Sequence, residues 1–268
     1  MHFIGEFAEI QQRLAQTRAV AERRRAVVEM LAPHRGERIL EIGCGAGLLL
    51  REIGLALGPH GLAAGVDISP DQIAAAARAC AEAPAVVAEV GDMRALDRPD
   101  AVFDAAVAVQ ALEYVEDVGT VLGELARVVK PGGRLVCLAT NWHSAFWHGP
   151  DADLTAEITA AWDSHAPHPN LPARLPAMLA AAGFGEIGQF PVPVVDSELD
   201  PESFAWWIAR LMAAHAVTEG VPEARAQGWI SALERAQAEG AFFFSMVPIL
   251  TLAQRPAQPC ETRLHALD

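Results

Sequence analysis

The chain has 268 residues, of which 52% are hydrophobic, and 34 acidic residues against 20 basic ones give it a formal net charge of −14. This balance excludes the broad basic surface expected of a nucleic-acid-binding protein. No run of eighteen apolar residues and no basic segment followed by an apolar core occurs, so we expect neither a membrane span nor a secretory leader. The four cysteines are spaced neither as disulfide pairs nor as metal ligands: Cys44, Cys80, Cys137 and Cys260. Unpaired thiols suit the reducing cytosol, so we expect a cytoplasmic protein.

The first predicted elements are helices in the N-terminal segment 1–35 and a strand that ends in a glycine-rich turn. An apolar run leads into Glu41 and then into Gly43, Gly45 and Gly47 at alternate positions. Glycine permits positive φ, lets a ligand approach closely and leaves main-chain N–H groups facing it. Glycine triplets also occur in ordinary turns, so the motif by itself is weak.

Two of the following strands end in a carboxylate. One apolar run ends at Asp67, where an acid can accept both hydroxyls of a ribose. The next ends at Asp92, which can accept the exocyclic amine of an adenine. Glu41 and Asp67 could instead cap the helices that follow, and Asp92 could be a plain turn residue. Further strands are predicted at 102–109 and 135–139.

In this order and spacing the five motifs resemble the class I S-adenosylmethionine (SAM)-dependent methyltransferases. Within that family they most resemble the branch that includes the ubiquinone and menaquinone methyltransferases and many small-molecule methyltransferases, and we expect a bacterial protein. The resemblance is close over 20–140. It implies an α/β Rossmann-like fold with a mostly parallel seven-stranded sheet, an antiparallel last strand and a helical cap that binds the acceptor. The SAM-binding core would span 36–140, and 141–255 would complete the same sheet and carry the inserted cap.

The resemblance also implies the cofactor contacts. Glu41 would order the glycine turn and hold the ammonium of SAM, Asp67 would bind the ribose, and Asp92 and Met93 would flank the adenine. In the preceding helix, Arg24 could approach the SAM carboxylate. The full set expected at the cofactor is Glu41, Gly43, Cys44, Gly45, Gly47, Asp67, Ile68, Gly91, Asp92, Met93, Gln110 and Ala111.

The chain departs from this family after the fourth strand, where many relatives have Leu-Glu-His and this chain has Leu112-Glu113-Tyr114. The usual imidazole is therefore absent. A base is needed only when the acceptor begins protonated, since alignment alone can supply much of the acceleration. The catalytic candidates are His165, then His143, and Tyr114, although these histidines could be surface or lid residues and Glu113 and Tyr114 a solvated helix start.

A metal site is the alternative interpretation of the segment 162–170, with Asp163, His165 and His168 as ligands. Its prolines prevent the helical presentation that makes histidine pairs chelate reliably, so we expect no metal.

Aromatic residues concentrate beyond residue 140, where all six tryptophans lie. Ligands of open α/β sheets bind beyond the carboxyl ends of strands, and aromatic side chains give a pocket large rigid walls. Trp142, Phe146 and Trp147 are therefore the candidate acceptor wall, unless they are core residues of the cap.

The remaining predicted elements are helices at 151–163, 171–183, 203–218 and 222–239, strands at 184–195 (broken at Pro191 and Pro193) and 241–252, and a flexible tail at 256–268.

The sequence favours a SAM-dependent methyltransferase that acts on an O, N or C atom of a small aromatic or apolar acceptor. The alternative is a SAM-binding protein of the same fold that acts as a cyclase, regulator or scaffold. A nicotinamide dehydrogenase is disfavoured, because Leu48 stands where its motif needs a small residue and the single lysine, Lys130, completes no Tyr-x-x-x-Lys pair. The sequence leaves open a homodimer and the identity of the acceptor.

Overall fold

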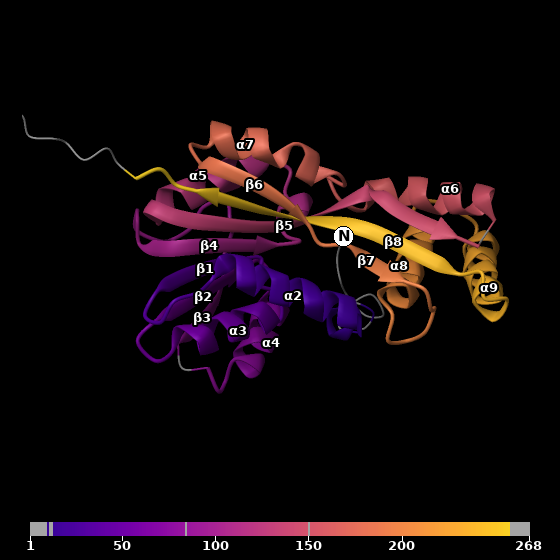
Figure 1. Cartoon of the computed structure of the whole chain (residues 1–268), viewed down its shortest axis with the longest axis horizontal. Coiled ribbons are helices and arrows are strands. Elements are labelled where there is room, and N and C mark those ends of the chain that lie inside the picture. Colours follow the sequence, from indigo (N-terminus) through magenta and orange to yellow (C-terminus); the bar gives the residue numbers. More distant parts are fainter. Residues whose placement is uncertain (1–9, 11–12, 84, 150, 258–268) are drawn as a thin grey trace, which may run out of the picture.

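The computed structural model describes residues 10, 13–83, 85–149 and 151–257, so most of the predicted tail, 258–268, lies outside the described residues. One sheet has the strand order β3-β2-β1-β4-β5-β8-β6, and β7 also pairs with β8 (Figure 1). The elements are α2 (Arg18–Leu31), β1 (Arg38–Ile42), α3 (Leu48–Leu57), β2 (Leu62–Asp67), α4 (Pro70–Ala79), β3 (Val86–Val90), β4 (Phe103–Val109), η1 (Leu112–Tyr114), α5 (Val118–Val128), β5 (Val129–His148), α6 (Ala152–Trp162), η2 (Asp163–His165), η3 (Leu171–Ala173), α7 (Leu175–Ala181), β6 (Gly185–Pro191), β7 (Val194–Asp196), α8 (Phe204–Thr218), α9 (Glu223–Ala238) and β8 (Phe243–Gln254).

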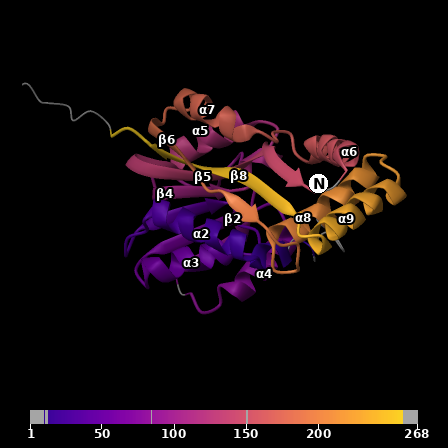
Figure 2. The same cartoon turned by 45° about the vertical axis from the view of Figure 1, so that its right-hand side comes forward.

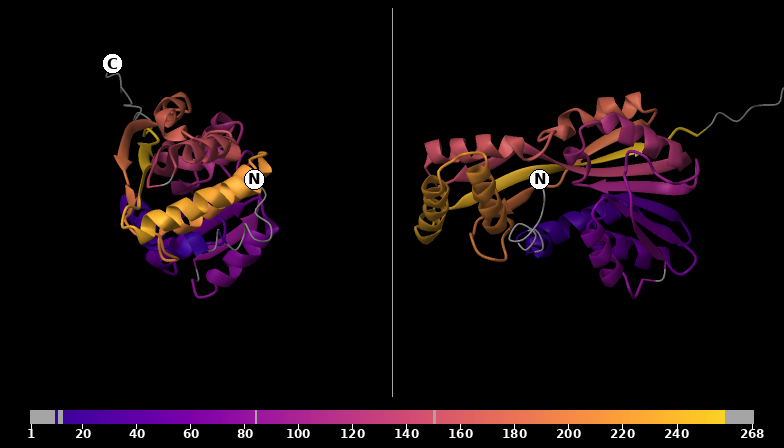
Figure 3. Two further views of the ribbon diagram at one scale, coloured as in Figure 1. Left: turned by 90° about the vertical axis from the view of Figure 1, so that its right-hand side faces the viewer. Right: turned by 180° about the vertical axis from the view of Figure 1, so that it is seen from behind.

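The first five strands are parallel, so their carboxyl ends meet at one edge of the sheet. Leu40 of β1 lies opposite Ala64 of β2 and Ala106 of β4. Alternate side chains point to opposite faces. Ile39 packs in the cluster under α2 and α3, whereas Leu40 packs in the cluster under α5 and α7. This three-layer arrangement confirms the predicted α/β fold, and Figure 3 shows the helices on both sides of the sheet.

The last strand is antiparallel to its neighbours, as predicted. β8 pairs antiparallel with β5 on one side and with β6 and β7 on the other. The edge strand is interrupted where Pro191 and Pro193 were expected to break it, because proline has no N–H to donate to the ladder. It is therefore divided into β6 and β7, which gives eight strands where seven were predicted.

The fifth strand was predicted to end at Ala139, and this boundary is wrong. β5 continues to His148, which pairs with Phe243 of β8. The partner strand lies about a hundred residues away in the sequence, so the local pattern does not reveal the extension. Figure 1 shows β5 and β8 running together out of the sheet toward α6, α8 and α9.

The extended ribbon and three helices form a cap with its own core. Trp229, Phe204 and Phe244 are fully buried in it. Figure 2 shows α8 and α9 next to the start of β8. Two of these helices begin where a capping side chain binds free N–H groups: Ser203 accepts from the N–H of Trp206 at the start of α8, and Asp151 accepts from the N–H groups of Asp153 and Leu154 at the start of α6. Among the described residues, no helix is both long and apolar enough to cross a bilayer.

Candidate functional site

The glycine turn after β1 has the backbone that the sequence predicted. Gly43, Gly45 and Gly47 have φ values of +65°, +51° and +78°. A Cβ on Gly43 would lie 2.5 Å from the Cβ of Ala111, and one on Gly47 would lie 2.8 Å from that of Ala76. A Cβ on Gly45 would meet nothing within 3.9 Å. Two glycines are therefore required by packing, and the third leaves the turn open on one side.

The expectation that the N–H groups of this turn face a ligand is wrong for Gly43, Cys44, Gly45 and Gly47, whose N–H groups have partners within the protein. The N–H groups of Gly43 and Cys44 both donate to the Val66 carbonyl, at 2.7 and 3.1 Å. The N–H of Gly45 donates to Asp67 Oδ2 at 2.9 Å, and that of Gly47 donates to the Cys44 carbonyl. These bonds connect the turn to β2, and the open Cβ position of Gly45 lets a ligand approach the main chain closely.

Asp67 is not the cap of the following helix, which was the alternative to ribose binding, because the N-cap of α4 is Ser69. Besides the bond from Gly45, its Oδ1 accepts from the N–H of Ser69 at 2.9 Å, at the start of α4. A carboxylate has about four acceptor positions, so these two bonds leave room for hydroxyl donors. Ribose binding by Asp67 stays a prediction.

Several acidic side chains lie close enough to interact near the turn. Glu41 is 3% exposed, and its Oε2 has no hydrogen-bond partner among the described residues. Burial, and then the charges of Asp67 and Glu52, raise the pKa of Glu41 well above its ordinary value. A positively charged ligand would relieve this repulsion, which fits the sulfonium and ammonium groups of SAM.

The residues predicted for the adenine lie at the ends of β2 and β3. Ile68 is 69% exposed, so its apolar side chain is available to pack on a flat ring. Asp92 is held by Arg94, whose Nη2 lies 2.6 Å from Oδ2, and this pairing lowers the pKa of Asp92. An adenine amine would therefore share this carboxylate with a guanidinium. The sequence argument did not consider Arg94 as its partner.

Gln110 lies at the end of β4 in a strained conformation. Its φ is +47°, which is uncommon outside glycine, and its Nε2 donates to Thr140 Oγ1 at 3.0 Å. Such strain persists only where the surroundings enforce it and is concentrated at functional sites. Gln110 and Ala111 were expected among the cofactor contacts, and that role stays a prediction.

Glu113 is buried and is not part of a solvated helix start. It is 2% exposed; Oε1 accepts from the N–H of Thr140 at 2.9 Å, and Oε2 has no partner among the described residues. Burial raises its pKa to about 7.

The arginine that reaches the interior is Arg23, not Arg24. Arg24 pairs with Glu52 at 3.4 Å, whereas Arg23 is 2% exposed. Consecutive residues point 100° apart on a helix, and Arg23 shares the buried side of α2 with Val27 and Leu31. The i, i+4, i+8 spacing of these three residues is the signal in the sequence that could have identified Arg23.

A group of rings lies next to η1, at the end of β4. His165 stacks on Trp162 at 4.1 Å between ring centres, and the rings of Trp142 and Tyr114 lie edge-on to His165 at 5.2 and 6.0 Å. His165 Nδ1 lies 2.5 Å from the Trp162 carbonyl, which can only accept, so Nδ1 carries the proton. Burial lowers the pKa of His165 to about 4, and Nε2 has no partner among the described residues.

His143, the second candidate base, is half exposed and lies 3.3 Å from Asp163, outside this ring group. The main-chain N–H of His168 donates to the Glu113 carbonyl in η1, and its side-chain Nε2 lies 3.2 Å from the Glu116 carbonyl. Within the described ranges, no three His, Cys, Asp or Glu side chains gather in a way that could hold a metal ion.

The three residues predicted to form one acceptor wall lie in different places. Trp147 is 7% exposed and packs in the cap core against Trp229 and Phe244, at 5.1 and 4.3 Å. Phe146 is 54% exposed, because neighbours on a strand point to opposite faces. Trp142 alone joins the ring group around His165.

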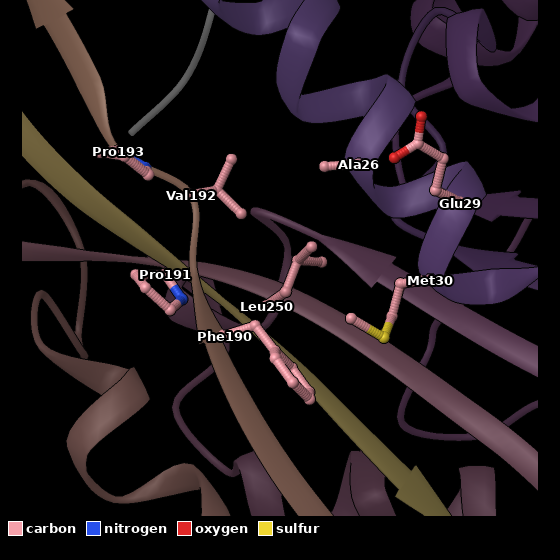
Figure 4. Close-up of a pocket in the computed structure, with 8 residues that line it drawn as sticks. All are labelled: Ala26, Glu29, Met30, Phe190, Pro191, Val192, Pro193 and Leu250. Atoms are coloured by element: carbon pink, nitrogen blue, oxygen red, sulfur yellow. The ribbon is translucent and has the colours of Figure 1, made fainter.

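An open apolar groove lies elsewhere, between α2 and the connection from β6 to β7 (Figure 4). Phe190 and Met30 form part of its wall, and Glu29 is its charged member. None of the residues that line this groove was predicted for the site.

Comparisons with known proteins identify the family of the chain. A family model described as a methyltransferase domain matches residues 40–137. An uncharacterized 37.1 kDa protein of transposon TN4556 from Streptomyces fradiae is 30% identical over 90% of this chain and 69% of its own. The demethylmenaquinone methyltransferase of Symbiobacterium thermophilum is 34% identical over 40% of this chain and 43% of its own. The [4+2]-cyclase SpnF superposes with a TM-score of 0.58 at 24% identity, covering 89% of this chain and 82% of that one.

The chain belongs to the class I SAM-dependent methyltransferase family. Its matches to the curated methyltransferases span about half of the length of those proteins or less. The cap lies outside the matched domain.

Proposed function

We propose that this chain transfers the methyl group of SAM to an oxygen, nitrogen or carbon atom of a small aromatic or apolar acceptor. The observation that carries the proposal is the open side of Gly45, between flanking glycines that leave no space for a Cβ. Asp67 accepts the N–H of Gly45, and the charges of Asp67 and Glu41 interact. Main chain that can be approached closely, beside carboxylates, suits a positively charged nucleoside.

When bound, SAM supplies an electrophilic methyl group on a sulfur atom that leaves as a neutral thioether. The protein has to hold the acceptor in line with that methyl group, since alignment supplies much of the acceleration. The rings of Tyr114, Trp142 and His165 support an aromatic or apolar acceptor at the end of β4.

His165 is the proposed base for a hydroxyl or amine acceptor. Its Nε2 carries a lone pair, because Nδ1 is the protonated nitrogen. The ring is neutral at neutral pH, since its pKa is lowered to about 4. As the acceptor atom bonds to the methyl carbon, its proton would pass to Nε2. A carbon acceptor that binds as an enolate would need no such transfer.

Incubation of the protein with methyl-tritiated SAM and a panel of phenols, quinols and aromatic amines tests the proposal. We expect label in at least one extracted acceptor and none with Gly45→Val. Tight binding of S-adenosylhomocysteine (SAH) without transfer to any acceptor would favour the SAM-binding alternative. Absence of SAH binding would exclude both functions.

A further inference from the structure

Two stacked rings of the cap each hold a buried polar atom without a partner. Trp162 is the last residue of α6, His165 is the last residue of η2, and both are 3% exposed. Their ring centres lie 4.1 Å apart, with an angle of 8° between the planes. Trp162 Nε1 and His165 Nε2 have no hydrogen-bond partner among the described residues. Because buried polar atoms in proteins are normally hydrogen-bonded, these two atoms require a partner that the described residues do not supply.

The two nitrogens have opposite hydrogen-bonding roles. An indole Nε1 can only donate. The imidazole proton lies on His165 Nδ1, which is 2.5 Å from the Trp162 carbonyl, so the neutral ring can only accept at Nε2. The nearly parallel stack holds the edges of the two rings side by side. One small group that both accepts and donates a hydrogen bond would therefore satisfy the two nitrogens together.

A hydroxyl group has this combination, since its oxygen accepts and its hydrogen donates. An ammonium group only donates, so it would leave Trp162 Nε1 without an acceptor. A carbonyl oxygen only accepts, so it would leave His165 Nε2 without a donor. A methyl group forms neither bond. The pair of nitrogens thus distinguishes a hydroxyl from the other groups that an aromatic acceptor can carry.

The neighbouring side chains favour an aromatic ring as the carrier of this hydroxyl. Trp142 lies edge-on to Trp162 and to His165, with ring centres 5.3 and 5.2 Å away. Tyr114 lies edge-on to His165 at 6.0 Å and is 39% exposed, so the ring group extends to the surface at η1. Aromatic rings pack well against other rings in such edge-on and stacked arrangements.

We propose that Trp162 Nε1 and His165 Nε2 bind the hydroxyl group of a phenol-type acceptor, and that its oxygen receives the methyl group. The inference rests on the proposed function and narrows the acceptor atom to oxygen. In the transfer, an oxygen lone pair forms the bond to the methyl carbon, the carbon–sulfur bond breaks with its electrons on sulfur, and the hydroxyl proton passes to His165 Nε2. The Trp162 N–H donates to the oxygen throughout and stabilises the negative charge that develops on it.

Calorimetric titration of the SAH-saturated protein with phenol, aniline and toluene tests the proposal, because these probes carry a hydroxyl, an amine or a methyl group on the same ring. We expect phenol to bind roughly 10-fold more tightly than the other two, the scale of one net hydrogen bond. Trp162→Phe and His165→Phe each keep a ring in the stack and lose one of the two nitrogens. Both variants should lose the preference for phenol and keep their affinity for SAH.

Trp147→Phe is the matched control. Its Nε1 is also buried without a partner among the described residues, but it lies in the cap core against Trp229 and Phe244. This variant should keep the preference for phenol.

The outcomes separate this inference from the proposed function. A wild-type protein that binds SAH but shows no preference for phenol, or binds none of the probes, would overturn the inference. A preference that survives in Trp162→Phe would also overturn it, with buried water as the partner of the two nitrogens. Transfer of label from tritiated SAM to amines or carbon atoms but to no phenol would overturn the inference and leave the proposed function intact. A wild-type protein that does not bind SAH would instead contradict the proposed function.

Discussion

Gly45 leaves the main chain of the turn open to a ligand, because it has no side chain on the open side. Its Cβ position is open, so we expect Gly45→Val to fill the space needed by SAM and to abolish SAH binding in a calorimetric titration. Gly36→Val is the matched control, since Gly36 also has a positive φ of +85° and an open Cβ position, but lies outside the site. Equal losses in both variants would show that backbone strain, and not occupied space, is the cause.

Asp67 has two roles that substitution can separate. Asp67→Ala should weaken SAH binding by about 1.5–3 kcal/mol, as expected for a lost charge-assisted bond, and should also lower the melting temperature because Gly45 and Ser69 lose their acceptor. Asp67→Asn keeps one acceptor oxygen. It should therefore retain most of the wild-type melting temperature while still binding SAH more weakly than the wild type. Asp71→Ala, an exposed acid in the same helix start, is the control. Unchanged SAH titration in Asp67→Ala would contradict ribose binding.

Glu113 should make the stability of the protein depend on pH. Its pKa is about 7 when folded and about 4.5 when unfolded, so the folded state keeps the proton longer. The resulting stabilisation is complete below about pH 4.5 and is lost as the pH rises to about 7, a change of about 3 kcal/mol. Urea unfolding at pH 5 and pH 8 should show this loss in the wild type and in Glu116→Gln, but much less in Glu113→Gln. Parallel pH dependence in all three would refute the assignment.

At the scale of the element, the continuation of β5 past residue 139 decides what its aromatic residues do. Trp147→Ala removes a ring from the cap core and should lower the free energy of unfolding by about 3–5 kcal/mol. Phe146→Ala, on the exposed face of the same strand, should change it by less than about 1 kcal/mol. Chemical unfolding of both variants is the measurement. A stable Trp147→Ala protein with a raised acceptor KM would restore Trp147 to the acceptor wall.

At the scale of the whole molecule, β5 and β8 run through both the sheet and the cap, so the two should unfold together. SAH at about 100 times its Kd should raise the free energy of unfolding by about 2.7 kcal/mol. All six tryptophans lie at 142–229, so their fluorescence reports on the cap, while circular dichroism reports on the whole chain. With SAH, both signals should give the same unfolding midpoint, higher than the midpoint without SAH. A SAH-dependent shift in only one of them would contradict a single cooperative unit.

The sequence alone determined the order of the elements, the glycine turn, the acids at the strand ends and the breaks in the edge strand. These features are local: glycine φ, proline without an N–H and the alternation of side chains act within a few residues. The tertiary structure decided the length of β5, because its partner β8 is distant in the sequence. The burial of Arg23 and the ion pair between Asp92 and Arg94 are likewise visible only in the tertiary structure.

The functions of single side chains in the cap likewise depended on the tertiary structure. Trp147 and Phe146 are neighbours of similar chemistry, yet one is buried and the other exposed, because only one face of the ribbon meets α9. His165 gained a defined tautomer from the Trp162 carbonyl. Which face is covered, and which polar atom is left without a partner, follows from packing between distant segments, and no local pattern in the chain encodes it.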